Sequence, residues 1–235
     1  MNAYTLSPSE LAVLVNHMTG GRLLEKAPSL AELRLDEQAW AKVEASLLDR
    51  GLLLSLPFEE ASGVTSQLAY ALSAALSPER VCVVRKVYEG HADPSVIFSF
   101  TPECITRNHV DAQGRHVFAE LADREEAISA ILSTAGESPT REAVTKRGTA
   151  KKGAATPRPR PVADLLKEAR RLVLLLIVAD PAEAAADATS LAWLETGEGL
   201  WLVDEESDGE APQASPIAPA KLRQLVGSRL EGSPD

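Results

Sequence analysis

The feature that most constrains the fold of this chain is an apolar run near its C-terminal third. Eight consecutive apolar residues extend from Leu172 to Ala179, and Asp180-Pro181 closes the run. A short run rich in Val, Ile and Leu, with a breaker behind it, is typical of a strand buried on both faces. A membrane-spanning helix needs about 20 apolar residues, so the run does not predict one. We therefore expect a strand in the middle of a sheet, with other elements covering both of its faces.

Apolar residues at helical spacing and runs of β-branched residues predict the remaining elements. The clearest start signal is Ser7-Pro8-Ser9-Glu10, a capping box with proline at the first helical position. Helices are predicted over 7–20, 36–50, 65–76, 123–132, 161–168 and 218–230. Strands are predicted over 52–56, 80–87, 95–100, 105–110, 115–121 and 171–180, with a hairpin of 190–195 and 200–204. An acidic loop is expected over 205–215.

Residues 136–160 differ in composition from the rest of the chain. Between Thr140 and Arg160 the segment carries seven basic residues and one acid, and it has almost no large apolar side chain. Such a segment buries too little surface to offset the entropy of ordering, so we predict a flexible basic linker. Residues 1–135 are then predicted to form the N-terminal helices and a first helix–sheet–helix half. Residues 136–160 form the linker, and residues 161–235 form a second helix–sheet–helix half of the same domain.

The two sides of the linker repeat one order of elements. Each gives a helix, a strongly apolar strand, a further strand or hairpin, and a closing helix. Two half-sheets with apolar faces bury them by joining or packing together. The predicted fold class is therefore α/β (α+β), with a central, mostly antiparallel sheet flanked by helices and built of two pseudo-symmetric halves. The alternative is that this common order of elements arises without any symmetry.

Charge and cysteine content limit the functional classes. The net charge is −10, whereas general nucleic-acid binders are basic. Within the chain, the basic linker is the better candidate for binding nucleic acid or an anionic surface, but the preferred interpretation is a soluble spacer kept extended by its charge. The first residues show neither the basic nor the apolar region of a secretory signal. Two cysteines in 235 residues favour a reducing compartment, and we expect a cytoplasmic protein without a membrane span.

No catalytic motif is recognised in the sequence. Cys104, His109 and His116 lie close in sequence but lack the paired spacing of zinc ligands. Two histidines on a surface hairpin are the simpler interpretation, and Cys82 is expected to be a buried small hydrophobe. The chain contains no nucleophile elbow and no dinucleotide-binding loop. We therefore expect a non-enzyme with no catalytic residue, cofactor or metal; an enzyme of an unrecognised type is the alternative.

The N-terminal helices followed by an extended segment at Leu52–Leu56 raise a second alternative. They could form a winged helix, with Asp36–Arg50 as the recognition helix of a DNA-binding regulator that also has an α/β sensing domain. That helix carries four acids against two basic residues. A helix that contacts phosphates should present cations, so the charge balance favours a packing helix.

Three local patterns add information beyond the order of elements. The first is the end of a Trp-bearing helix, which reads small, Leu, x, x, Arg, Gly, Leu. The second is a helix that leads through Ser-Pro into a strand, followed by a turn and a His-Val-Phe strand. The third is a late strand joined by an acidic loop to a final helix. The first pattern is Ser46–Leu52. The second consists of Ser77-Pro78, Asp111–Gly114 and His116-Val117-Phe118. The third consists of Trp201–Asp204 and Ile217-Ala218-Pro219.

With these patterns the chain, from about Ser7 to Leu230, resembles the EspG family of type VII (ESX) secretion chaperones. The resemblance implies a quasi-two-fold α/β fold around a central antiparallel sheet. It also implies a cytosolic chaperone that holds the apolar tip of a PE–PPE substrate pair. The long basic linker is a departure from the family pattern, and no functional residue is carried over from it.

The expected function is a cytosolic protein-binding adaptor or chaperone that shields an apolar segment of a secreted, possibly helical, partner. Large apolar residues of the second half are the candidates for contact with that partner: Trp193, Trp201, Leu222 and Leu225.

Overall fold

The computed structural model describes residues 2–20, 35–56, 61–88, 91–136, 158–182, 187–204 and 211–232. These residues form two compact units, each made of two chain segments: Met1–Glu79 with Phe98–Ala122, and Arg80–Ile97 with Asp123–Asp235. The predicted linker lies almost wholly outside the described residues. Residues 205–210 of the expected acidic loop, which was predicted over 205–215, lie outside them as well.

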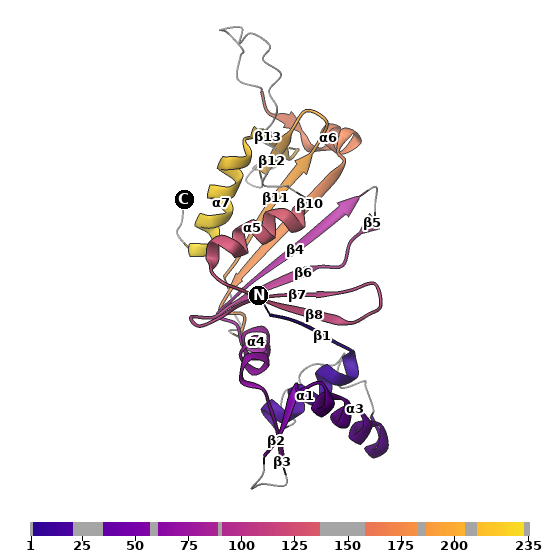
Figure 1. The fold of residues 1–235 in the computed structure, drawn as a ribbon. Helices are drawn as coiled ribbons and strands as arrows, with labels where there is room; N and C mark the ends of the chain where they lie inside the picture. The colour runs from indigo at the N-terminus through magenta and orange to yellow at the C-terminus, as the bar shows by residue number, and fades with distance from the viewer. Residues whose placement is uncertain are drawn as a thin grey trace, which may run out of the picture. The chain divides into compact units, whose positions relative to one another are not determined.

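The described residues of the first unit form the helices α1, α3 and α4 and two sets of antiparallel strands (Figure 1). Strand β1 pairs with β8, and β8 pairs with β7, while β2 and β3 form a separate hairpin. The elements are β1 (Ala3–Leu6), α1 (Pro8–Thr19), α3 (Glu37–Asp49), β2 (Leu53–Leu56), β3 (Ala61–Val64), α4 (Ser66–Leu76), β7 (Ile105–Val110) and β8 (His116–Leu121). Strand β6 (Val96–Phe100) joins the two units along the chain.

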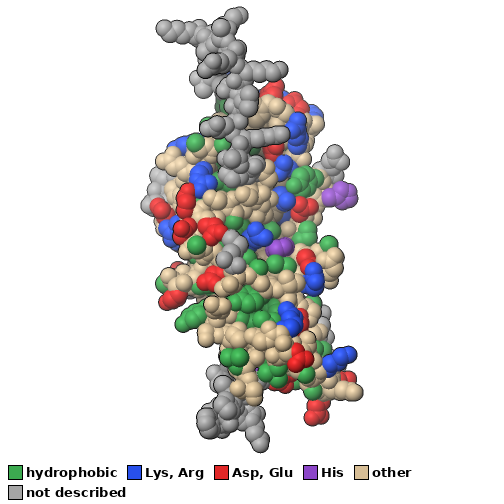
Figure 2. Space-filling model, viewed as in Figure 1, with side chains coloured by type: hydrophobic (Ala, Val, Ile, Leu, Met, Phe, Trp, Pro, Cys, Tyr) green, Lys and Arg blue, Asp and Glu red, His purple; other side chains and the backbone are tan. Residues whose placement is uncertain are grey.

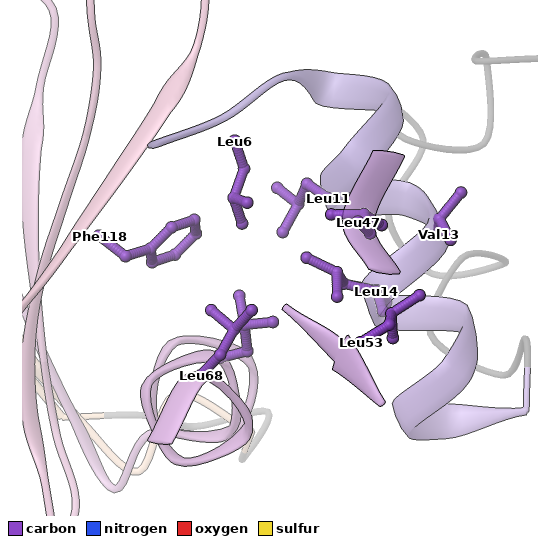
Figure 3. Close-up of a cluster of buried hydrophobic side chains, with 10 residues drawn as sticks. Leu6, Leu11, Val13, Leu14, Leu47, Leu53, Leu68 and Phe118 are labelled. Carbon is purple, nitrogen blue, oxygen red and sulfur yellow. The ribbon is translucent and has the colours of Figure 1, made fainter. Parts of the chain in front are cut away.

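The core of the first unit forms between its helices and its sheet. Leu6, Leu14, Leu68 and Phe118 come from β1, α1, α4 and β8, and their side chains point toward one another in Figure 3. All four are almost completely buried. Fully burying one leucine stabilises a fold by about 1.5–3 kcal/mol, so this cluster fixes the helices against the sheet.

The capping box predicted at the start of α1 is confirmed. The Ser7 hydroxyl accepts a hydrogen bond from the Glu10 amide at 3.2 Å, and the Glu10 carboxylate accepts one from the Ser7 amide at 2.7 Å. The helix ends at Gly20, which has a positive φ of 61°. The start and the end of α1 are therefore both set by local side-chain chemistry.

The second unit is built on a longer antiparallel sheet (Figure 1). Its strand order is β4-β10-β11-β12-β13-β9, and β5 pairs with β4. The elements are β4 (Arg80–Tyr88), β5 (His91–Ala92), α5 (Arg124–Ala135), β9 (Arg160–Pro161), α6 (Val162–Glu168), β10 (Arg171–Ala179), β11 (Ala188–Glu195), β12 (Leu200–Asp204), β13 (Gln213–Ile217) and α7 (Pro219–Glu231).

Helices α5 and α7 pack against each other on one face of this sheet. The Arg223 guanidinium on α7 donates to the Ser129 hydroxyl on α5 at 2.9 Å, and it also contacts the Glu125 carboxylate. Gly227 of α7 lies close to Ile128 of α5, where an added Cβ would come within 3.4 Å of the isoleucine. A small residue at this position therefore lets the two helices approach closely.

Antiparallel sheet structure flanked by helices confirms the predicted α+β class. The predicted hairpin of β11 and β12 is also confirmed. Five short strands of the described residues were not predicted: β1, β3, β5, β9 and β13, the last of which begins inside the expected acidic loop. That the two halves form one domain and are related by symmetry stays a prediction.

Candidate partner-binding surface

Strand β10 lies in the middle of its sheet, as its apolar sequence predicted. It pairs antiparallel with β4 on one side and with β11 on the other, so that Leu175 lies opposite both Val84 and Leu191. Both of its edges are therefore occupied by main-chain hydrogen bonds over most of its length.

The prediction that β10 is covered on both faces is wrong. Val173, Leu175 and Ile177 are buried, but Leu174 and Leu176 between them are 40% and 42% exposed. Successive side chains of a strand point to opposite faces, so one face is covered and the other is open. A continuous apolar run does not distinguish a strand covered twice by its own chain from a strand with one face left open.

We call this second face the open sheet face. It is read from the register, because residues opposite one another in neighbouring strands share a face. Leu174 lies opposite Arg85 and Ala192, and Leu176 lies opposite Val83 and Ser190. The open sheet face therefore consists of Val81, Val83 and Arg85 on β4, Leu174, Leu176 and Val178 on β10, and Ala188, Ser190 and the buried Ala192 on β11.

Helix α6 closes one end of this face. Leu165 of α6 is completely buried against Leu194 and Trp201, and Leu172 packs against the same cluster. Leu172 and Leu174 are on the same side of β10, two residues apart. Helix α6 therefore covers Leu172 but not Leu174, and the aliphatic surface continues from beneath α6 into the open sheet face.

The residues predicted to contact a partner are mostly in the interior. Trp193 and Leu222 are 1% and 0% exposed, Trp201 is also buried, and only Leu225 is half-buried. The Trp201 ring packs under the Arg160 guanidinium, 5.5 Å from its centroid. A role of these four residues in binding stays a prediction, and in the present arrangement their side chains support the sheet and α7 from within.

The charges of the three central strands are divided unequally between the two faces. On the covered face, Arg171 pairs with Glu195 at 2.7 Å, and Lys86 pairs with Asp93 at 3.1 Å. On the open sheet face, Arg85 is the one charged residue among the described positions of β4, β10 and β11. The opposite side of the second unit carries acidic and basic side chains interspersed, as Figure 2 shows over α5 and α7.

The two hairpin histidines do not form a shared site. His109 lies opposite Val117, whereas His116 lies opposite Val110, so the rings occupy opposite faces of the β7–β8 hairpin. Burial lowers the pKa of both side chains, and the nearby Arg107 lowers the pKa of His109 further. Among the described residues, no group of three or more His, Cys, Asp or Glu side chains could hold a metal ion.

Both cysteines are buried thiols in reduced form. Cys82 lies on the covered face of β4, and burial strongly raises the pKa of its thiol. The pKa of Cys104 is also raised, first by burial and then by Glu120 and Glu103. A raised pKa keeps a thiol protonated and poorly nucleophilic, which agrees with the structural role expected for Cys82.

The N-terminal elements follow the order of a winged helix, with α1 and α3 followed by the β2–β3 hairpin. The surface of α3 nevertheless carries the exposed acids Glu37 and Asp49 beside a single exposed lysine, Lys42. His17 on α1 pairs with Glu44 on α3 at 3.0 Å, so this acid serves the packing of the two helices. These charges do not favour contact with phosphates.

Comparison with solved structures finds a similar fold. No family model matches the sequence, and no curated protein matches it either. The fold is similar to that of a known secretion chaperone. The matched structure is the Mycobacterium tuberculosis type VII secretion system chaperone EspG5 in complex with a PE25-PPE41 dimer. The TM-score is 0.60, the sequence identity is 9%, and the match covers 99% of this chain and 97% of EspG5.

The likeness to EspG5 concerns the fold, because at this identity only the arrangement of elements is compared. The neighbouring structure is that of a chaperone, which is not an enzyme, and it holds a protein partner. In the described part of this chain, no helix is long and apolar enough to cross a membrane.

Proposed function

We propose that the chain is a non-enzymatic chaperone or adaptor whose open sheet face covers an apolar segment of a partner protein. The observation that carries the proposal is the exposure of Leu174 and Leu176 in the middle of a sheet. Central strands are the usual site of a hydrophobic core, and an apolar patch left open there is typical of a binding surface.

The size of the surface suits reversible shielding. Leu174 and Leu176 keep about two fifths of their surface in water, so covering each contributes roughly 1 kcal/mol. Val81, Val83 and Val178 are half-buried and add smaller amounts. Their sum is a fraction of the roughly 8 kcal/mol of a micromolar complex, so contacts beyond this face must contribute to tight binding. A partner held this way can be handed over without unfolding the chaperone.

The likeness to EspG5 supports a more specific form of the proposal. In this form the chain acts in the cytoplasm as an EspG-like component of type VII secretion, and its partner is a helical secretion substrate. EspG5 itself was captured with a PE25-PPE41 dimer, and both proteins share one fold over nearly their whole lengths. The same proposal includes a sheet built of two pseudo-symmetric halves and a basic linker that serves as a spacer between them.

The test is an affinity pull-down from the native host, with identification by mass spectrometry. We compare the wild-type chain with the double variant Leu174→Asp, Leu176→Asp. The matched control is Tyr70→Asp, which places a charge at another exposed apolar residue on α4. We expect a partner that the wild type and the control retain and that the double variant loses, although all three unfold at similar temperatures. Retention by the double variant, or no specific partner for the wild type, would contradict the proposal.

A further inference from the structure

Among the described positions of β4, β10 and β11, Arg85 is the only charged residue on the open sheet face. It is exposed, and its register partner on β10 is Leu174. The described residues offer it no hydrogen bond, ion pair or aromatic ring. Three neighbouring cations of the second unit are paired with acids: Lys86 with Asp93, Arg160 with Glu168, and Arg171 with Glu195.

An unpaired guanidinium beside exposed leucines restricts what can cover them. In the free chain, water solvates Arg85 at no cost. A wholly apolar segment that covered Leu174 would also remove water from the neighbouring cation, and burying an uncompensated charge costs several kcal/mol. That cost exceeds the gain from covering the two leucines. A partner that binds here must therefore bring an acceptor for the guanidinium, and a carboxylate is the strongest one available in proteins.

The occupant is a helix rather than a strand. Both edges of β10 are already paired, with β4 and with β11, so no main-chain groups are free for strand addition at the centre of this face. A helix that lies across the strands needs no main-chain hydrogen bonds from the sheet. Helices α5 and α7 already pack on the opposite face in this way (Figure 1).

We infer that the partner of the open sheet face is an amphipathic helix with one Asp or Glu beside its apolar stripe, and that this carboxylate pairs with Arg85. The inference rests on the proposed function and specifies its partner. The apolar stripe covers Leu174 and Leu176, and the carboxylate selects the helix and fixes its position. In this way a chain with a net charge of −10 recognises one carboxylate of its partner through one local cation.

The test uses three synthetic helical peptides of about 18 residues, roughly five turns. They share a Leu/Ala stripe and differ at one position beside it, which is Glu, Gln or Lys. Dissociation constants are measured by fluorescence anisotropy for the wild-type chain, Arg85→Gln and Arg85→Glu. For the wild type we expect the Glu peptide to bind about tenfold more tightly than the Gln peptide, and the Lys peptide to bind most weakly. Arg85→Gln should remove the difference, and Arg85→Glu should reverse the order.

A matched control separates local pairing from overall charge. Lys221→Glu makes the same change of two charges at an exposed position of α7 and should leave the order of the three peptides unchanged. The inference is overturned if Arg85→Glu weakens all three peptides equally, or if the wild type binds none of them or does not distinguish Glu from Gln. The proposed function fails on a different result, the retention of the native partner by the Leu174→Asp, Leu176→Asp variant.

Discussion

Arg50, the C-cap residue that follows α3, donates a hydrogen bond from Nη2 to the main-chain carbonyl oxygen of Thr5 on β1 at 3.0 Å. The same guanidinium contacts the carboxylate of Glu10, the residue that completes the capping box of α1. One side chain therefore connects the end of a helix, the start of another helix and a strand.

Replacing Arg50 should loosen this connection. We expect Arg50→Ala to lower the free energy of unfolding by about 1 kcal/mol, because a partly exposed network contributes modestly. Arg50→Lys should restore only part of the loss, since one ammonium group does not reproduce the two-armed geometry. Urea unfolding followed by circular dichroism measures the change. Lys42→Ala, at an exposed position of α3, is the control, and an equal effect of both alanine variants would contradict the role given to Arg50.

The two faces of β10 should respond very differently to truncation. We expect Leu175→Ala to lower the free energy of unfolding by about 2–5 kcal/mol, because its side chain is 1% exposed and its removal leaves a cavity. Leu174→Ala should change it by less than about 1 kcal/mol. Thermal or urea unfolding of the two variants tests this. Similar losses for both would show that the open sheet face is covered in the free chain.

Acid should weaken the first unit through His116. The ring is partly buried, stacks on Phe118 at a centroid distance of 6.3 Å, and has a pKa below its usual 6.5. The unfolded chain therefore takes up the proton first, so the contribution of His116 is intact above pH 6.5 and is lost as the pH falls below it.

This pH dependence can be isolated by substitution. His116→Gln should show a smaller loss of unfolding free energy than the wild type between about pH 7.5 and 5.5. His91→Gln is the matched control, because His91 is exposed, and it should follow the wild type. If His116→Gln and the wild type lose stability in parallel, the buried ring is not the cause. His109, whose pKa is also lowered, accounts for part of the remaining slope.

Two glycines with positive φ allow strain to be separated from crowding. Gly114 has φ 75° and open space around it, whereas a Cβ on Gly136, with φ 95°, would lie 1.2 Å from the Arg171 guanidinium. Arg171 donates to the Ala135 carbonyl at 2.9 Å and pairs with Glu195. We expect Gly114→Ala to cost about 1 kcal/mol and Gly136→Ala at least 1 kcal/mol more, as measured by urea unfolding. Equal costs would show that Arg171 moves aside freely.

The winged-helix alternative has a direct test. In a gel-shift experiment at low salt with random duplex DNA, we expect no shift at micromolar protein concentration. The reason is the acidic surface of α3, where Glu37 and Asp49 would face the phosphates. The variant Glu37→Lys, Asp49→Lys shows whether charge alone is the obstacle. Salt-sensitive binding by the wild type would revive the DNA-binding interpretation.

Elements governed by local chemistry could be predicted from the sequence. The Ser7-Pro8-Ser9-Glu10 box and the turn at Asp111–Gly114 form as predicted, and Asp36 and Asp123 cap the helices predicted to begin at these residues, because each feature depends on residues a few positions apart. At the end of α3, Gly51 has a positive φ of 65°, and the Leu52 amide donates to the Leu47 carbonyl. The Arg-Gly-Leu sequence at Arg50–Leu52 is thus a local stop signal for the helix, and Arg50 also bonds to Thr5 and Glu10.

Elements that depend on distant partners could not be predicted in the same way. Strand β13 includes Pro216 and has no alternating apolar pattern, and it exists because β12 pairs with it along its whole length. Strand β1 likewise depends on β8. The open sheet face was missed for another reason. The apolar run at Leu172–Ala179 signals burial, but periodicity does not say whether the second cover comes from the same chain or from another molecule.

The Thr5 carbonyl bound by Arg50 also bears on the free edge of strand β1. Among the described residues, β1 pairs with β8 alone, and a strand with one bare flank is a template for polymerisation with other chains. A guanidinium already seated on that flank removes an acceptor that an incoming strand would need. The arginine on this edge therefore disfavours association of strands through β1, whereas the apolar side chains of the open sheet face stay exposed.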